Sequence, residues 1–164
     1  GLVLIAKNKS AAAKYSTLMQ KEGGFNKQYE ALICGKLSEP KGTFVDYLKK
    51  DGRTNTSAIV PADAAANDKE AKLSKLEYEV ISYDEVKDIT HVRIHLITGR
   101  HHQIRVQFAS RGHALVGDYK YATADCDMDN AVKAVALKRN QIALCAVSLT
   151  VDNKTYSVAP EFLL

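Results

Sequence analysis

The densest group of residues that could do chemistry lies in the sequence T-G-R-H-H-Q-I-R, which ends at Arg105. Arg100 and Arg105 could bind anions, because a guanidinium presents its N–H donors in a planar fork that matches carboxylates and phosphates. Arg105 follows His101 by four residues and His102 by three, so on a helix these three side chains share a face. This spacing predicts an anion-binding turn with one cation aimed inward and another at its mouth. Spacing alone is also compatible with a charged helix start whose arginines are only solvated, although the density of polar groups favours the anion-binding turn.

The neighbouring elements predict how this turn is positioned. Residues 90–96 alternate between apolar and polar types, which is typical of a half-buried strand. Beyond Gly99, Ile104 and Phe108 lie four residues apart, which predicts a helix that buries one stripe and ends at Gly112. A strand that leads through Gly99 into a helix places unpaired N–H groups beside the loop, where anions are favoured.

The first third of the chain predicts a strand, a helix and a second strand. Residues 1–6 form a continuous apolar run, as in strands buried on both faces. Asn8 or Ser10 can cap a helix that ends at Gly23-Gly24. Residues 27–34 read as a strand with Tyr29 on one face. The residues expected on the buried face of the helix are Ala13, Tyr15, Leu18 and Met19.

The remaining chain predicts short strands and one further helix. Residues 35–68 are expected to form loops with short strands near Phe44 and Ile59. The polar run K-K-D-G-R-T-N predicts a solvated turn around Asp51-Gly52, with a mobile basic loop over a substrate as the alternative for Lys49, Lys50 and Arg53. Residues 73–82 are expected to be a strand and 131–139 a helix. Residues 142–150 and 156–159 are expected to form a hairpin that turns at Asp152-Asn153. The mixture predicts an α+β domain with a largely antiparallel sheet.

Composition bounds the class of protein. A chain of 164 residues fits one domain, and its net charge of +4 is compatible with a polyanionic partner without requiring one. No apolar run approaches the ~18 residues of a membrane span. The cysteines Cys34, Cys126 and Cys145 are odd in number and lack a C-x-x-C pair, which predicts free thiols and a reducing cytoplasm. The histidines and aspartates do not have the spacing of zinc or calcium ligands, so no metal site is expected.

Two segments carry a resemblance to a known family. The sequence T-G-R-x-H-Q-I-R followed by G-H-x-x-x-G-D-x-x-Y resembles the third motif, and the segment after it, of RluA-type RNA pseudouridine synthases. About a dozen positions agree in type and spacing, which is far more specific than a lone glycine loop. Residues 27–35 are similar to the family's second motif, K-x-Y-x-A-x-V-x-G. Residues 2–8 resemble the L-L-L-x-A-K-N that follows its first motif. Two departures are His101, where Thr or Ser is usual, and Cys145, where the family has histidine.

The resemblance spans nearly the whole chain and implies a fold and an activity. The implied fold is an α+β pseudouridine synthase catalytic domain over residues 1–164, with flanking helices and without its N-terminal strands. In the implied reaction a uridine of ribosomal or transfer RNA is flipped out, its glycosidic bond is broken, and the uracil is rejoined through carbon. Tyr29 would pack on the base and assist proton transfer, and Arg105 would pair with the catalytic aspartate. Residues implied in substrate binding are Lys27, Gly99, Arg100, His102 and Gln103.

The resemblance also implies the setting in which the protein works. RNA is the expected partner, with no cofactor, no metal and no membrane. A monomeric, cytoplasmic protein of bacterial type is expected.

The nucleophile is the residue that the printed chain does not supply. In the family the aspartate lies in H-R-L-D-x-x-T-S-G, and Gly1 matches the final glycine, which puts the nucleophile five residues before Gly1. The fragment is therefore expected to be inactive alone, since Asp118 matches a different family position. Two other interpretations are a non-catalytic RNA-binding module that keeps the fold, and a domain that binds a small phosphorylated ligand at the Gly99 turn.

Overall fold

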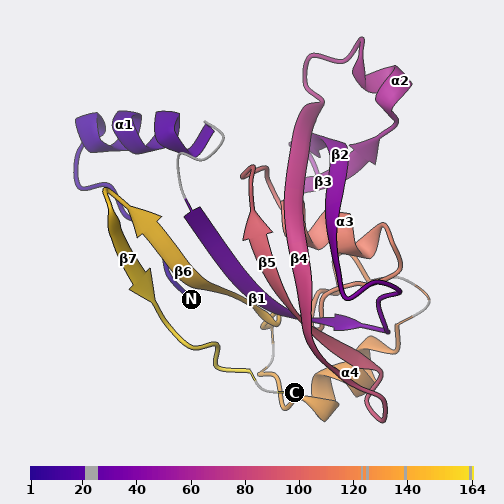
Figure 1. Cartoon of the computed structure of the whole chain (residues 1–164). Coiled ribbons are helices and arrows are strands. Elements are labelled where there is room, and N and C mark those ends of the chain that lie inside the picture. Colours follow the sequence, from indigo (N-terminus) through magenta and orange to yellow (C-terminus); the bar gives the residue numbers. More distant parts are fainter. Residues whose placement is uncertain (21–25, 123, 125, 139, 163) are drawn as a thin grey trace.

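A single antiparallel sheet organises the protein in the computed structural model, which describes all residues except 21–25, 123, 125, 139 and 163. Its seven strands lie in the order β3-β2-β4-β5-β1-β6-β7, and every neighbouring pair is antiparallel (Figure 1). The expected α+β class with a largely antiparallel sheet is confirmed. The strands are β1 (Asn26–Cys34), β2 (Lys41–Asp51), β3 (Thr56–Val60), β4 (Lys72–Asp84), β5 (Ile89–Leu96), β6 (Leu144–Val151) and β7 (Lys154–Ser157). The helices are α1 (Lys9–Gln20), α2 (Ala62–Ala65), α3 (Gln103–Ala109) and α4 (Met128–Ala134).

Strand β1 is buried on both faces and divides the core into two clusters. Ala31 and Ile33 face the cluster that contains Ile104 and Phe108 of α3. Leu32 faces the other cluster, to which α4 contributes Met128 and Ala131. The alternation expected for β5 is confirmed, because Val92, Ile94 and Leu96 are buried in the α3 cluster. The sheet therefore holds α3, and the turn that precedes it, against one face.

Strand β2 is longer than the sequence predicts. It runs for eleven residues, of which only Phe44 and Leu48 are buried. An alternation of apolar and polar residues is therefore visible over only a small part of the strand. Its length comes from backbone pairing with β4 on one side and β3 on the other. The expected turn is confirmed, since the Asp51 carboxylate accepts hydrogen bonds from Arg53 N–H (2.8 Å) and the Thr54 hydroxyl (2.9 Å).

The predicted strand over residues 1–6 is wrong. This segment is not a strand, and Val3 and Ile5 are each 79% exposed. Strand β6 is already paired on both sides, with β1 and with β7, so residues 1–6 cannot pair with it as a further strand. The segment contacts β6 where a bulge interrupts the pairing of β1 with β6, and there Leu2 N–H donates to the carbonyl of Ala146 (2.9 Å).

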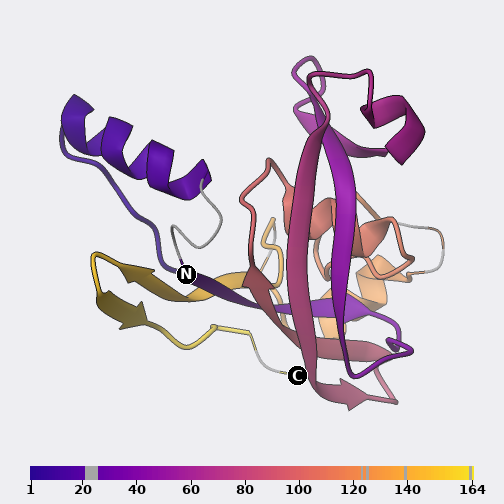
Figure 2. The ribbon, with the colours of Figure 1, turned by 45° about the horizontal axis from the view of Figure 1, so that its top comes forward.

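Helix α1 forms as expected but does not enter the core. Asn8 caps it, accepting from Ala11 N–H at 2.8 Å. Its predicted buried face is wrong, because Ala13 is exposed and Tyr15 and Leu18 are only partly covered. Figures 1 and 2 both place the helix apart from the sheet, beside the β6–β7 turn. Lys14 and Tyr15 bind Asp152 there (3.0 and 2.5 Å). The Gly23-Gly24 helix end and the side chain of Met19 lie outside the described residues.

The C-terminal elements follow the sequence more closely. The predicted hairpin is confirmed, with Asp152 and Asn153 both in the left-handed region that such a two-residue turn requires (φ 47° and 61°). Helix α4 starts earlier than predicted, where the Asp127 carboxylate caps Asn130 N–H. It also ends earlier, at Ala134, because Ala136 has a φ of 50° and cannot continue the helix. Among the described helices, none has the length and apolar character that crossing a bilayer requires.

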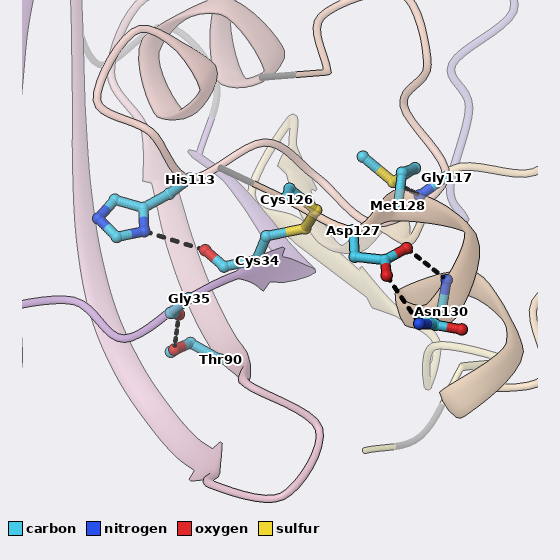
Figure 3. Close-up of a disulfide and its surroundings, with 9 residues drawn as sticks. All are labelled: Cys34, Gly35, Thr90, His113, Gly117, Cys126, Asp127, Met128 and Asn130. Carbon is cyan, nitrogen blue, oxygen red and sulfur yellow. Dashed lines mark hydrogen bonds between the residues drawn. A yellow bond between two sulfur atoms is a disulfide. The ribbon is translucent and has the colours of Figure 1, made fainter. Parts of the chain in front are cut away.

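The pairing of the cysteines also differs from the prediction. Cys34, at the end of β1, forms a disulfide with Cys126, so the expectation of a free thiol is wrong for both residues (Figure 3). The two cysteines are 92 residues apart in sequence, and only the tertiary fold brings them together. Cys145 is free and buried, as expected. The end of β1 is also held by His113, whose Nδ1 donates a hydrogen bond to the Cys34 carbonyl (3.0 Å). The disulfide therefore ties the segment before α4 to β1.

We predict that reduction lowers the stability of the domain. Closing a loop of this length stabilises a fold by about 4–5 kcal/mol in the chain-entropy model. Dithiothreitol should therefore lower the urea midpoint of the natural chain and leave that of Cys126→Ser unchanged. An equal response of the two proteins would show that the disulfide does not form in solution.

Candidate functional site

The turn between β5 and α3 is built around the side chain of Gln103. Its Oε1 accepts hydrogen bonds from Arg100 N–H and the Thr98 hydroxyl, both at 2.9 Å, and its Nε2 donates to the carbonyl of Lys75 (3.1 Å). Gln103 is only 2% exposed, so these bonds are made where water does not compete. The contacts hold the turn against β4.

The two histidines stack on each other at the start of α3. His102 lies in the left-handed region (φ 52°), which a residue other than glycine adopts at an energetic cost. In this conformation its ring stacks on that of His101, with 3.8 Å between centroids. The helix that follows has only seven residues, shorter than the sequence suggests. Side-chain contacts rather than a long helix dipole therefore dominate the electrostatics of this turn.

Arg105 is held by a buried carboxylate, that of Asp118. Its Nε and Nη2 donate to the two carboxylate oxygens at 2.6 and 2.7 Å, and Asp118 is 1% exposed. The guanidinium also lies over the ring of Tyr121, 4.9 Å from its centroid. The sequence suggested that this arginine serves an aspartate outside the printed residues, and it missed Asp118 as a partner. Asp118 follows Gly117, whose φ of 86° and close approach to the Gln141 carbonyl exclude a side chain.

Tyr121 and Ser57 extend this pair into a polar network that sequence reasoning also missed. The Tyr121 hydroxyl accepts from Ser57 N–H (2.8 Å) and lies 2.9 Å from His102 Nδ1. Burial, and then the charge of Arg105, lower the pKa of His102 to about 4, so the ring is neutral at neutral pH. The only available signal was that Tyr121 and Asp118 both fall within the G-D-x-x-Y motif.

Tyr29 and Lys27 lie on β1 and form a second group. With Leu2–Leu4 and part of β6 they line a cavity of about 220 Å³. Burial raises the pKa of Tyr29 and lowers that of Lys27. The Lys27 ammonium lies 4.0 Å from the position that a Cβ on Gly99 would take.

These two groups are adjacent but separate. Tyr29 packs on the core cluster that contains Ile104, the residue before Arg105. No direct contact joins Tyr29 to Arg105 among the interactions of the described residues. Arg100 belongs to neither group, since its Nε donates to the carbonyl of Leu73 (3.0 Å). Strand β1 thus presents an aromatic ring in a mostly apolar cavity, and a guanidinium fixed by Asp118 lies near the start of α3.

The strand histidines are engaged elsewhere. His91 lies 3.1 Å from a carboxylate oxygen of Glu30, and His95 lies 3.4 Å from one of Glu77. Within the described ranges, no three His, Cys, Asp or Glu side chains cluster closely enough to hold a metal ion.

Comparison with known proteins identifies relatives of the chain. Residues 1–110 match the family model described as RNA pseudouridylate synthase. RNA pseudouridylate synthase domain-containing protein 1 of Mus musculus is 33% identical over 135 residues, which cover 79% of this chain and 42% of that protein. Ribosomal large subunit pseudouridine synthase D of Blochmanniella floridana is 35% identical over 123 residues, covering 74% and 35%.

Solved structures support the same fold. Human RNA pseudouridylate synthase domain containing 1 superposes with a TM-score of 0.69 at 24% identity, over 95% of this chain and 62% of that one. The chain spans about two fifths of the length of the first curated relatives it matches. The curated relatives come from both bacteria and animals, so they do not single out the bacterial type.

We predict that the Arg105–Asp118 pair is a main source of the site's stability. Asp118→Asn leaves a largely buried guanidinium without a counter-charge, which should cost about 3–5 kcal/mol of unfolding free energy. Glu70→Gln removes the exposed partner of Lys49 and should leave the urea midpoint unchanged. Similar midpoints for the two variants would contradict a strong pair.

We further predict an acid sensitivity that originates at His102. Its folded-state pKa of about 4 lies below the ordinary value of 6.5, so between these pH values the unfolded chain binds more protons than the folded one. Stability should therefore fall as the pH falls from 6.5 towards 4. In His102→Asn, which tolerates the left-handed backbone, the decline should be shallower. Urea titrations at several pH values measure both slopes, and parallel curves would refute the assignment.

Proposed function

The chain belongs to the RNA pseudouridylate synthase family, and we propose that the protein of which it forms part converts specific uridines of ribosomal or transfer RNA to pseudouridine. The observation that carries the proposal is that the matched residues include both Tyr29, which lines a mostly apolar cavity, and Arg105, which a buried carboxylate fixes. Residues 1–164 form the catalytic domain in this proposal. The reaction is an isomerisation: the bond from N1 to the ribose breaks, a bond from C5 forms, C5 loses a proton and N1 gains one.

The cavity beside Tyr29 is the proposed place for the flipped uracil. A flipped base is stabilised by stacking on an aromatic ring, which offsets part of the cost of extruding the nucleotide. Because burial raises the pKa of Tyr29, its hydroxyl stays protonated at neutral pH and can donate a hydrogen bond to the base. Lys27 lines the same cavity and is proposed to hold the phosphate of the flipped nucleotide.

The catalytic aspartate is proposed to enter from the segment before Gly1. Gly1 lies against Ala146, the cross-strand partner of Tyr29. Five extended residues span at most about 17 Å, so a carboxylate five positions upstream is within reach of the cavity. On this proposal the printed chain is inactive by itself.

Arg105 is proposed to keep that aspartate ionised. Asp118 takes Nε and Nη2, while Nη1 forms no hydrogen bond with a described residue. A buried carboxylate without a partner takes up a proton, whereas a bond from Nη1 favours its charged form. Asp118 then acts as the second carboxylate, which fixes the direction of the guanidinium.

The remaining residues of the turn are proposed to bind the backbone or to shape it. Arg100 and the Gly99 backbone would contact phosphates at the mouth of the turn. His102, neutral at neutral pH, would present a hydrogen-bonding ring rather than a charge. Gln103 would orient the turn through its three hydrogen bonds.

The function is tested by mapping pseudouridines in ribosomal and transfer RNA from cells with and without the parent gene. Loss of specific pseudouridines on deletion supports the proposal. Unchanged maps, or the absence of R-L-D from the codons before Gly1, would instead favour a non-catalytic RNA-binding module.

For the full-length protein we predict that Arg105→Lys lowers kcat by about 10²-fold or more while RNA affinity changes little, because an ammonium cannot hold Asp118 with a fork and at the same time direct a bond to the reacting carboxylate. Arg111→Lys is the matched control, since Arg111 binds Asp46 at the far end of α3. Single-turnover assays together with RNA binding separate the two effects. Equal losses of turnover and affinity would remove Arg105 from the chemistry.

A further inference from the structure

Hydrogen bonds join the β2–β3 hairpin to the turn before α3, the helix that contains Arg105. The Ser57 hydroxyl donates to the carbonyl of His101 (2.9 Å) and lies 2.9 Å from His101 Nδ1. Because the hydroxyl has one proton, Nδ1 must be the donor in the second bond. Lys120 completes the attachment, donating to the carbonyls of Thr54 and Asn55 at 3.0 Å each.

This attachment determines which lysine of the hairpin faces the site. Lys50 is the cross-strand partner of Ser57, and directly opposed residues of an antiparallel pair point to the same face. Lys50 therefore continues the row of Asp46 and Leu48, the face of β2 on which Gln107 of α3 binds Asp46 (2.6 Å). Lys50 projects beside His101.

Lys49 and Lys50 differ in their partners as well as in their direction. Lys49 points to the opposite face and binds Asp68 (2.8 Å) and Glu70 (3.1 Å). Within the part of the chain that the structure describes, the exposed Lys50 side chain has no hydrogen bond or ion pair. The carboxylate of the next residue, Asp51, is engaged inside the hairpin turn by Arg53 N–H and Thr54.

Positive charge gathers around the His101 ring. After burial, the causes that lower the pKa of His101 are the charges of Lys50, Arg105 and Lys120. The carboxylate nearest to Arg105, Asp118, is buried and already paired. The surface between the hairpin and the turn is therefore suited to an anion, and it adjoins the proposed catalytic site.

We propose that Lys50 binds a phosphodiester of the RNA strand next to the flipped nucleotide, and that the His101–Ser57 junction and Lys120 are positioning contacts that hold Lys50 there. The proposal rests on the proposed function, in which RNA is the substrate. It also gives a role to His101, the position where this chain departs from the Thr or Ser usual in the family. The imidazole of His101 bonds the hydroxyl of Ser57 in the hairpin. A Thr or Ser side chain at position 101 is shorter and would not make the same contact.

The test compares Lys50→Ala with Lys49→Ala in the full-length protein. Binding of a fluorescein-labelled oligouridylate is followed by anisotropy at several salt concentrations. Loss of one phosphate contact to a single strand should reduce the slope of log K against log salt by about 0.7. We expect this reduction and a several-fold weaker affinity for Lys50→Ala, the natural slope for Lys49→Ala, and a restored slope for Lys50→Arg.

Positioning by His101 is tested by a double-mutant cycle. His101→Ala keeps every lysine and arginine but removes the bond between the imidazole and the Ser57 hydroxyl, so it should reduce the slope in the same direction as Lys50→Ala, and the double variant should show no loss beyond that of Lys50→Ala. Additive losses would overturn the positioning role. Uridine monophosphate should compete poorly with the oligouridylate, and effective competition would indicate a mononucleotide site instead.

The outcomes separate this inference from the function on which it rests. If the natural protein binds the oligouridylate and Lys50→Ala behaves like Lys49→Ala, the phosphate contact is refuted while the proposed function stands. If the natural protein does not bind RNA at all, the proposed function and the phosphate contact both fail.

Discussion

The bidentate pair between Arg105 and Asp118 is the interaction on which the rest of the site depends. It joins the start of α3 to the segment after Gly117, and the carboxylate is almost fully removed from water. A buried pair with short, forked hydrogen bonds has one favourable geometry, so it fixes the direction of the guanidinium. It also places Tyr121 beneath that guanidinium, and Tyr121 in turn bonds Ser57 of the hairpin.

Two further elements contribute to the candidate site, and neither forms it alone. Strand β1 holds Tyr29 and Lys27 through its pairing with β5 and β6, and the Lys27 ammonium lies near Gly99. The β2–β3 hairpin reaches the turn before α3, where Ser57 bonds His101. Groups held on strands are positioned more accurately than groups on long loops, because their backbones are hydrogen-bonded on both sides. The sheet thus fixes the positions of the candidate site residues.

The sequence by itself determined the local structure wherever burial follows a simple period. Residues 90–96 alternate because one face of β5 is buried in the α3 cluster. The turn at Asp152-Asn153 follows from residues that tolerate the left-handed backbone. The motif around Arg105 indicated the family and the place of the turn. The prediction from sequence failed for residues 1–6. Their continuous apolar run resembles a buried strand, but β6 is already paired on both sides.

Only the tertiary structure decided which side chains meet. Arg105 and Asp118 are 13 residues apart, His101 and Ser57 are 44 apart, and Cys34 and Cys126 are 92 apart, so no local pattern encodes these contacts. Side-chain hydrogen bonds and disulfides depend on distances set by the packing of whole elements. Periodicity reports only whether one element has an apolar face. For this reason the sequence identified the arginine and its turn, whereas the fold supplied the carboxylate and the hydroxyl that hold them.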